Sequence, residues 1–122
     1  MKKILLVDDE VDVREVLKKK FEQNGYSVTT VASGKWAIDV CRESKPDIVL
    51  LDIAMPELNG YQICERLKND KDTCGAAVLF ITGKDLDPDG VTQRCKELGA
   101  VGYLPKPSTF EEIFKKVKEI IG

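Results

Sequence analysis

The sequence predicts an α/β domain built on a five-stranded parallel sheet with helices on both faces. Three short apolar runs, at residues 4–7, 48–51 and 77–81, are continuous rather than alternating, which is typical of strands covered on both sides. Helical patterns separate these runs, and such strand–helix alternation favours a parallel sheet. With 122 residues, 43% of them hydrophobic, the chain can form one compact domain. Right-handed connections make 2-1-3-4-5 the expected strand order.

The first strand, 4–7, leads into a helix whose apolar residues share one face at helical spacing. These residues are Val13, Val16, Leu17 and Phe21. Asn24-Gly25 is a C-terminal stop signal for this helix. A weaker strand is expected at 26–31, followed by a second helix with Ser33 as its N-cap. The apolar positions of that helix are Ala37, Ile38, Val40 and Cys41.

The third helix follows strand 48–51, and its apolar positions are Tyr61, Ile63, Cys64 and Leu67. After strand 77–81, Asp87 and Pro88 form the N-cap and first position of a fourth helix, which ends at Gly99. A fifth strand is expected at 101–104. The last helix is predicted to begin with a capping box of Ser108 and Glu111. Its buried stripe is Phe110, Ile113, Phe114, Val117 and Ile120.

Charge and missing residue types exclude several classes of function. Lys and Arg number 19 against 21 Asp and Glu, a net charge of −2, so the chain has no general attraction for nucleic acid or an anionic membrane. There is no histidine, which excludes Ser-His-Asp, Cys-His and histidine–metal sites within the chain. The four cysteines form no CxxC pair and are expected to be the reduced thiols of a cytoplasmic protein.

Polar residues stand where the strands end, the edge at which open α/β sheets bind ligands. The run Asp8-Asp9-Glu10 follows the first strand, Asp52 ends the third, Thr82 follows the fourth and Lys106 follows the fifth. Taken singly, the acidic run would cap a helix and the others would be ordinary loop or surface residues. Taken together, the carboxylates would repel one another without a cation. Carboxylate oxygens are suitable ligands for Mg²⁺.

A magnesium ion, a carboxylate, a hydroxyl and a lysine suit phosphoryl transfer. That reaction needs mainly positioning and neutralisation of oxygens, which the metal and the lysine supply. An aspartate can act as the nucleophile and form an acyl phosphate. Asp52 is the expected nucleophile because it ends the third strand, with the other groups around it.

Four segments of the chain resemble the receiver domain of two-component response regulators, the CheY-like family. They are residues 5–10, 52–60, 82–83 and 99–107, and the resemblance covers the whole chain. It implies a CheY-like, flavodoxin-like fold, with residues 1–122 forming the receiver domain and no output domain in this chain. It also implies a signalling switch rather than an enzyme, one that catalyses its own phosphorylation and dephosphorylation.

The resemblance further implies that Asp52 takes a phosphoryl group from a phosphohistidine. The donor would be a sensor histidine kinase or a histidine phosphotransfer protein, and the missing histidine agrees with a donor on another protein. Asp9, Asp52 and the backbone carbonyl of Ala54 would bind Mg²⁺ directly, and Asp8 through water. No direct contact with nucleic acid or a membrane is expected.

Switching residues follow from the same resemblance. Lys106 would pair with the phosphoryl oxygens, Thr82 would hydrogen-bond one of them, and Tyr103 would turn into the space that Thr82 leaves. The surface of the fourth helix, fifth strand and fifth helix would then change and meet a downstream effector or output domain. Ala54 and Lys84, two residues after Asp52 and Thr82, are expected to make self-dephosphorylation slow, since alanine cannot position a water.

Partner docking is expected at the start of the first helix and at the loop after the fifth strand. The residues are Val11, Arg14, Glu15, Lys18, Pro107 and Ser108. Exposed apolar residues beside an acidic pocket would suit an amphipathic helix of the partner.

Three other functions remain open at this point. A phosphohydrolase of the haloacid-dehalogenase kind requires a DxD pattern after the first strand and a cap domain. A flavodoxin-like electron carrier requires a Ser/Thr/Gly-rich loop where this chain has acids. A receiver that binds partners without being phosphorylated would not need the complete site.

Overall fold

A computed structural model of the chain describes residues 1–55, 58–83, 87–106 and 108–122, with only the backbone at Thr82. Five parallel strands form one sheet in the order β2-β1-β3-β4-β5, as predicted. The strands are β1 (Lys3–Val7), β2 (Ser27–Val31), β3 (Ile48–Asp52), β4 (Ala77–Thr82) and β5 (Gly102–Pro105). The helices are α1 (Val11–Gln23), α2 (Gly34–Ser44), α3 (Gly60–Lys68), α4 (Pro88–Leu98) and α5 (Phe110–Ile121).

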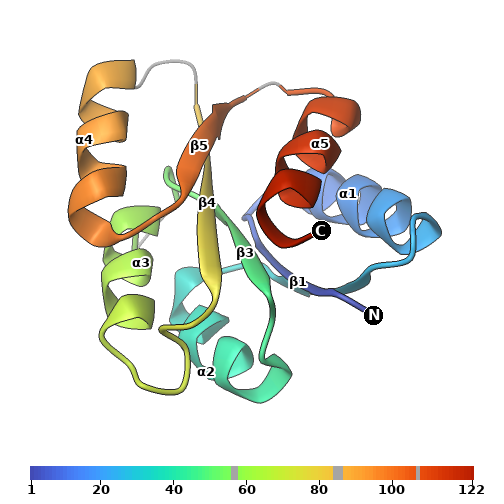
Figure 1. Ribbon diagram of the computed structural model, residues 1–122, viewed down its shortest axis with the longest axis horizontal. Coiled ribbons are helices and arrows are strands. Elements are labelled where there is room, and N and C mark those ends of the chain that lie inside the picture. The colour runs from blue at the N-terminus through green and yellow to red at the C-terminus, as the bar shows by residue number, and fades with distance from the viewer. Residues whose placement is uncertain (56–57, 84–86, 107) are drawn as a thin grey trace.

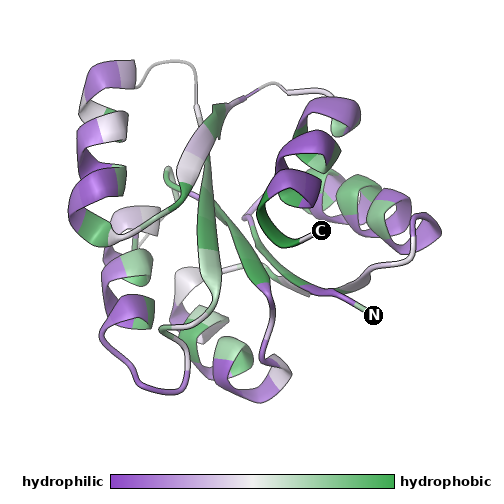
Figure 2. Cartoon of the chain, in the orientation of Figure 1, coloured by the Kyte–Doolittle hydropathy of each residue, from purple (hydrophilic) through white to green (hydrophobic). Residues whose placement is uncertain are grey.

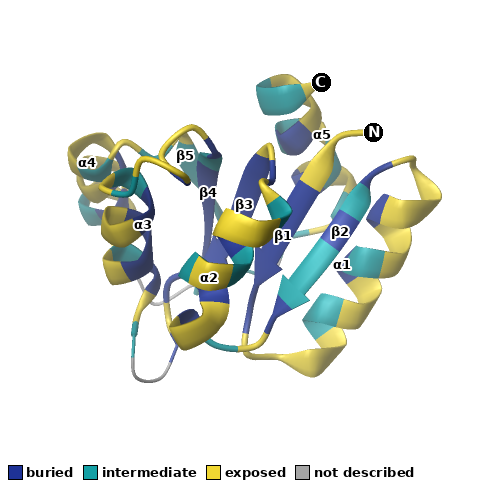
Figure 3. Ribbon diagram, turned by 90° about the horizontal axis from the view of Figure 1, so that it is seen from below, coloured by how far each residue is buried: buried dark blue, intermediate teal, exposed yellow. Residues whose placement is uncertain are grey.

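The helices cover the two faces of the sheet unequally, with α1 and α5 on one face and α2, α3 and α4 on the other (Figure 1). Side chains of a strand point to the two faces in turn. Leu5 and Val7 therefore pack in the layer of α2–α4, and Ile4 and Leu6 in the layer of α1 and α5. Strand β3 is buried at every residue, and β1 from Ile4 to Val7 (Figure 3). These stretches are apolar except for Asp52 (Figure 2), which explains why they read as continuous apolar runs.

A group of aromatic rings joins α1 to α5. The ring of Phe21 lies 5.0 Å from that of Phe110 and 5.6 Å from that of Tyr26, both edge to face. Phe114 packs against the same ring at 6.2 Å. This packing fixes the start of α5 against α1.

Helix ends follow the sequence signals with one exception, the capping box of α5. Asp87 caps α4 and Gly99 ends it with a φ of 77°, as predicted. Ser33 stands at the N-cap of α2 but its side chain makes no cap hydrogen bond. The capping box of α5 is wrong by one residue, because Thr109 and Glu112 form it.

The pattern S/T-x-x-E fits both positions of the α5 sequence, so the local signal is ambiguous. The packing of Phe110 against Phe21 belongs to the observed register, in which Phe110 is the first helical residue. The Ser108 hydroxyl instead donates to the carbonyl of Pro105.

The cysteines are free thiols, as predicted, with Cys41, Cys64 and Cys95 buried and Cys74 exposed. Burial raises the pKa of both the Cys41 and the Cys64 thiol to about 11, which keeps them protonated and unreactive. Within the described part of the chain, no helix combines the length and apolar character needed to cross a membrane.

Gly60 is where the start of α3 meets the end of β3. A Cβ atom at Gly60 would lie 2.6 Å from the carbonyl oxygen of Asp52 and 2.7 Å from the Cα of Ile53. Both contacts are with backbone, which cannot turn away. The Gly60 N–H also donates to the carbonyl of Ile53 at 3.0 Å. The absence of a side chain therefore lets α3 pack directly against the turn that carries Asp52.

We expect Gly60→Ala to lower the free energy of unfolding by about 2 kcal/mol, because the overlap forces α3 away from β3. Urea unfolding measures this change. Gly75→Ala is the matched control, because nothing lies within 4 Å of a Cβ at that position, and its effect is expected to stay within about 0.5 kcal/mol. Equal losses in the two variants would contradict this account.

Candidate functional site

Four carboxylates gather at the carboxyl end of the sheet. Asp8, Asp9, Glu10 and Asp52 each offer an oxygen, and these oxygens all lie within 4.8 Å of one another. Strand register explains the meeting, since Val7 pairs with Leu51 and the residue after each is an aspartate. Asp8 and Asp52 are 1% and 4% exposed, whereas Asp9 and Glu10 are exposed. The cluster thus has a buried half and an open half.

Backbone groups hold one oxygen of each buried aspartate. Asp8 Oδ1 accepts a hydrogen bond of 2.9 Å from the N–H of Glu10, and Asp52 Oδ1 accepts one of 3.1 Å from the N–H of Ala54. Arg14 donates from Nη1 to the carbonyl of Asp8 at 2.8 Å. These bonds leave Oδ2 of each aspartate available to the centre of the site.

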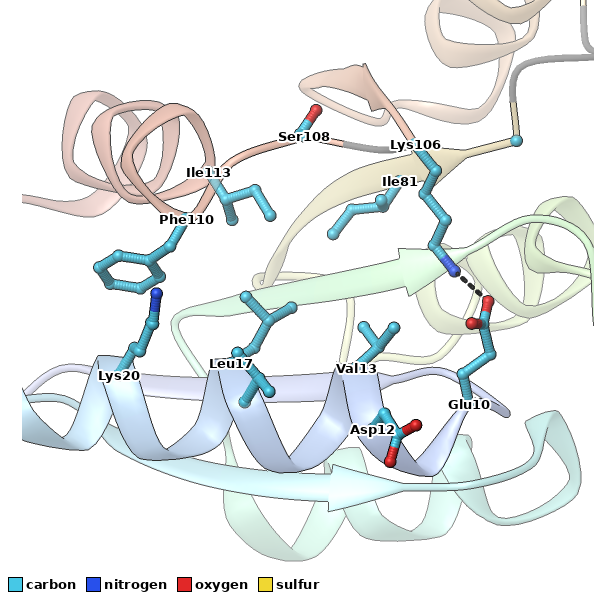
Figure 4. A pocket seen from close by; sticks show the side chains of 12 residues that line it. Glu10, Asp12, Val13, Leu17, Lys20, Ile81, Lys106, Ser108, Phe110 and Ile113 are labelled. Atoms are coloured by element: carbon cyan, nitrogen blue, oxygen red, sulfur yellow. Dashed lines mark hydrogen bonds and ion pairs between the residues drawn. The ribbon is translucent and has the colours of Figure 1, made fainter.

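Lys106 fills that centre. Its Nζ lies 2.8 Å from Asp8 Oδ2, 3.2 Å from Asp52 Oδ2 and 3.2 Å from Glu10 Oε1. Figure 4 shows Lys106 reaching from the end of β5 towards Glu10 at the start of α1. Lys106 thus contacts the acidic residues at the ends of the first and third strands, Asp8 and Asp52, as the sequence predicts.

Burial and charge shift the ionisation of Asp52 and Lys106. Burial raises the pKa of Asp52 and the charge of Asp8 raises it further, while Lys106 and the Ala54 N–H act in the opposite direction. Burial alone would lower the pKa of Lys106, but the hydrogen bond and charge of Asp8 and the charge of Asp52 raise it above the ordinary value. Lys106 is therefore charged at neutral pH, and the site favours a further cation.

The donor set fits Mg²⁺. Oxygens bound to one such ion lie about 2.1 Å from it, so opposite ligands are about 4.2 Å apart. The 4.8 Å spread of the carboxylate oxygens is close to that value. The open half of the cluster, with Asp9, is where an ion would retain water ligands. Ala54, whose N–H donates to Asp52 Oδ1, is exposed as well.

The expected switch residues lie on β4 and β5. Thr82 ends β4, where its backbone is paired with Pro105. Tyr103 is paired with Phe80, is half-buried and packs against the core layer of α2–α4. Pro107 and Lys84 lie outside the described residues.

An apolar groove of about 660 Å³ runs between α1 and α5 beside the site (Figure 4). Lys106 and Glu10 stand at one end, and Lys20 lies under the ring of Phe110. The apolar lining residues are Val13, Val16, Leu17, Ile81, Phe110 and Ile113. Val16 was expected on the apolar face of α1 with Leu17; it lines the groove and is 52% exposed.

The residues expected to dock a partner lie on two different faces. Ser108 lines the groove. Glu15 and Lys18 line a separate hollow on α1, and Arg14 turns to the carbonyl of Asp8. Val11 is 52% exposed and does not line the groove.

Sequence reasoning missed two contacts, that of Glu10 with Lys106 and that of Arg14 with Asp8. Arg14 lies one helical turn after Glu10, and this spacing is the only local signal that it faces the site. No local signal connects Glu10 with Lys106, because 96 positions separate them in the sequence.

An acidic cluster and a lysine at the carboxyl edge of a 2-1-3-4-5 sheet define a receiver-type signalling domain. The family model for the response regulator receiver domain matches residues 4–118, and the chain belongs to this family. Receiver domains are signalling switches of two-component systems rather than ordinary enzymes, and they bind Mg²⁺ at an acidic pocket. The predicted family and fold are confirmed.

Curated relatives include response regulator MprA of Mycolicibacterium vanbaalenii, 36% identical over 121 residues. Another is the alkaline phosphatase synthesis transcriptional regulatory protein PhoP of Bacillus subtilis, 37% identical over 120 residues. Each match covers 98% of this chain but only 50% and 48% of the relative. The chain therefore spans about half the length of these curated relatives.

Solved structures agree with the fold. Chemotaxis protein CheY4 of Vibrio cholerae has a TM-score of 0.90 at 26% identity, with 98% of each chain covered. A response regulator receiver domain protein from Clostridium thermocellum has a TM-score of 0.87 at 32% identity, covering 99% of this chain and 94% of its own.

We expect Asp52→Asn to raise the free energy of unfolding at neutral pH without divalent cations. The pKa of Asp52 is higher in the native state than in the unfolded chain, so stability falls as pH rises from the ordinary value of 3.8 through the raised one. Asp52→Asn is therefore expected to be more stable than the native protein at pH values above the raised pKa of Asp52. The difference in stability is expected to disappear at pH values below 3.8. Urea unfolding over a pH series measures the difference.

Added Mg²⁺ serves as the control, because it is expected to stabilise the native protein and to have less effect on Asp52→Asn. A variant less stable than the native protein at neutral pH would contradict the electrostatic account.

Proposed function

We propose that Asp52 accepts a phosphoryl group from a phosphohistidine of a sensor histidine kinase or histidine phosphotransfer protein. Residues 1–122 are proposed to be the receiver part of a response regulator. The observation that carries the proposal is the buried carboxylate of Asp52, with Oδ2 3.2 Å from Lys106 Nζ and within 4.8 Å of three further carboxylates.

The chemistry follows from this placement. A carboxylate oxygen of Asp52 forms the new bond to phosphorus while the bond from phosphorus to the imidazole nitrogen breaks, and the electron pair leaves with the imidazole. An ionised carboxylate needs no general base. Lys106 then neutralises charge on the phosphoryl oxygens. Bound Mg²⁺ would supply further neutralisation, and Asp9, Asp52 and the Ala54 carbonyl would hold it, with Asp8 acting through water.

Phosphorylation is proposed to change the surface of α4, β5 and α5. Lys106 and Thr82 would contact the phosphoryl group in only one of two arrangements, and this difference shifts the population. The pairing of Thr82 with Pro105 supports the link from β4 to β5. Tyr103, half-buried two residues before Pro105, is the proposed second switch residue.

A downstream effector or output domain is the proposed recipient of the signal. The curated relatives are about twice as long as this chain, and the name of PhoP describes a transcriptional regulatory protein. We propose that the receiver itself contacts neither nucleic acid nor a membrane. Its free thiols agree with a cytoplasmic location.

The decisive experiment is incubation with acetyl phosphate and Mg²⁺, followed by measurement of the intact mass. We expect one phosphoryl adduct on the native protein and none on Asp52→Asn. Chelation of the metal is expected to suppress the adduct. An adduct that persists in Asp52→Asn would place the acceptor elsewhere, and rapid turnover of several phosphate esters would favour a phosphohydrolase.

We predict that the phosphorylated protein loses its phosphoryl group slowly, because position 54 carries an exposed alanine. A methyl group cannot orient a water towards the acyl phosphate, whereas an amide can. We expect the adduct to decay several-fold faster in Ala54→Asn than in the native protein, as measured by the intact mass over time. Faster decay in Ala54→Gly than in Ala54→Asn would contradict this mechanism.

We further propose that the helix carrying the phosphohistidine docks in the groove between α1 and α5. The groove runs beside Lys106 and has an apolar floor. It extends along α1 from Glu10 to Lys20, ten residues or about 15 Å of helix, which matches two to three turns of a partner helix. Ser108, one of the residues expected to dock a partner, also lines this groove.

Val16 and Val11 provide a matched pair, because both lie on α1 and both are 52% exposed. Val16 lines the groove and Val11 does not. We expect Val16→Asp to slow phosphotransfer from the cognate kinase about tenfold, and Val11→Asp to slow it less. Phosphorylation by acetyl phosphate is the control and is expected to be unchanged in both. If only Val11→Asp slowed phosphotransfer, the groove would not be the docking site, and the surface expected from the sequence, which includes Val11, would be favoured instead.

A further inference from the structure

We propose that Glu10 is a positioning residue that holds Lys106 at the site until a phosphoryl group arrives, and then gives up its contact. This inference rests on the proposed function. It assigns to Glu10 a role distinct from that of a metal ligand, and it makes the contact between Glu10 and Lys106 part of the phosphorylation equilibrium.

The first argument is the number of donors on Lys106. An ammonium group has three N–H donors, and Lys106 has three carboxylate partners, Asp8, Glu10 and Asp52. Every donor is therefore engaged. A new phosphoryl oxygen can be bound in full only if Lys106 releases one of these partners.

The second argument identifies which partner is released. The bond from Lys106 to Asp8 is the shortest, at 2.8 Å, and the side chain of Asp8 is 1% exposed. Asp52 bears the phosphoryl group and must stay close. Glu10 lies 3.2 Å from Lys106 and its side chain is 61% exposed, so water can replace Lys106 at its carboxylate. Exposed ion pairs are weak, which makes this contact the easiest to exchange.

The third argument is that the Glu10 side chain does not stabilise the start of α1 by capping it. Glu10 is the N-cap of α1, yet its side chain makes no cap hydrogen bond. The backbone of Glu10 makes the hydrogen bonds at this helix start. Its N–H donates to Asp8 Oδ1, and its carbonyl accepts from the N–H of Arg14 at 3.1 Å. Replacing the carboxylate is therefore expected to leave the helix start intact and to remove only the contact with Lys106 that Figure 4 shows.

Binding of beryllofluoride, a phosphoryl analogue, in the presence of Mg²⁺ tests the exchange by calorimetry. We expect Glu10→Gln to bind it about two- to fivefold more tightly than the native protein, the factor that corresponds to one exposed ion pair. Asp12→Asn is the matched control, because Asp12 lies in the first turn of the same helix and its substitution removes the same charge. Its affinity is expected to be unchanged.

Glu10→Asp separates contact from charge. It keeps the carboxylate but is one methylene shorter, so it is expected to follow Glu10→Gln. If Glu10→Gln and Asp12→Asn raised the affinity for beryllofluoride equally, the effect would come from the loss of one negative charge, and the proposal would be overturned. Weaker binding in Glu10→Gln would overturn it as well, since Glu10 would then act as a ligand.

A second measurement is independent of phosphoryl chemistry. In protein labelled with nitrogen-15 on lysine, the ammonium protons of Lys106 are expected to exchange faster with water in Glu10→Gln than in the native protein or Asp12→Asn. No change would overturn the positioning role of Glu10. Failure of the native protein to bind beryllofluoride, with faster exchange still observed, would overturn the proposed function alone.

Discussion

The site depends on one interaction, the ammonium of Lys106 among the carboxylates of Asp8, Glu10 and Asp52. Negative groups this close repel one another, and two of them are buried where water cannot screen them. The lysine offsets only part of that repulsion, because its single positive charge faces four carboxylates. Burial is the main reason why the pKa of Asp52 stays raised. The resulting excess of negative charge favours binding of a divalent cation beside Asp52.

Rigid packing keeps this strained group of charges in place. Asp8 and Asp52 follow paired residues of two buried strands, and α3 presses against the turn after β3 at Gly60. On the other side of the sheet, aromatic contacts hold the start of α5 against α1. With the proposed exchange of the Lys106 contacts, the domain would combine a fixed acceptor, Asp52, with a movable lysine, a combination that suits a signalling switch.

The surface of α1 carries two separate features. One face borders the apolar groove next to α5, and the other carries Glu15 and Lys18 beside a shallow hollow. Only the first leads directly to Lys106. A phosphohistidine donor docked in this groove, as proposed, would meet the chemistry at the same end of α1, where Glu10 lines the groove and pairs with Lys106 (Figure 4).

The sequence by itself determined the order of the elements, the parallel sheet and the residues at the strand ends. Those features follow from local periodicity and from the rule that parallel strands end at one edge. Only the tertiary structure decided the register of the α5 cap, the exposure of Val16 and the partner of Glu10. Each of these depends on contacts between distant segments. Phe110 packs on Phe21, α5 leaves Val16 uncovered, and Lys106 reaches Glu10 across 96 positions, none of which a local pattern encodes.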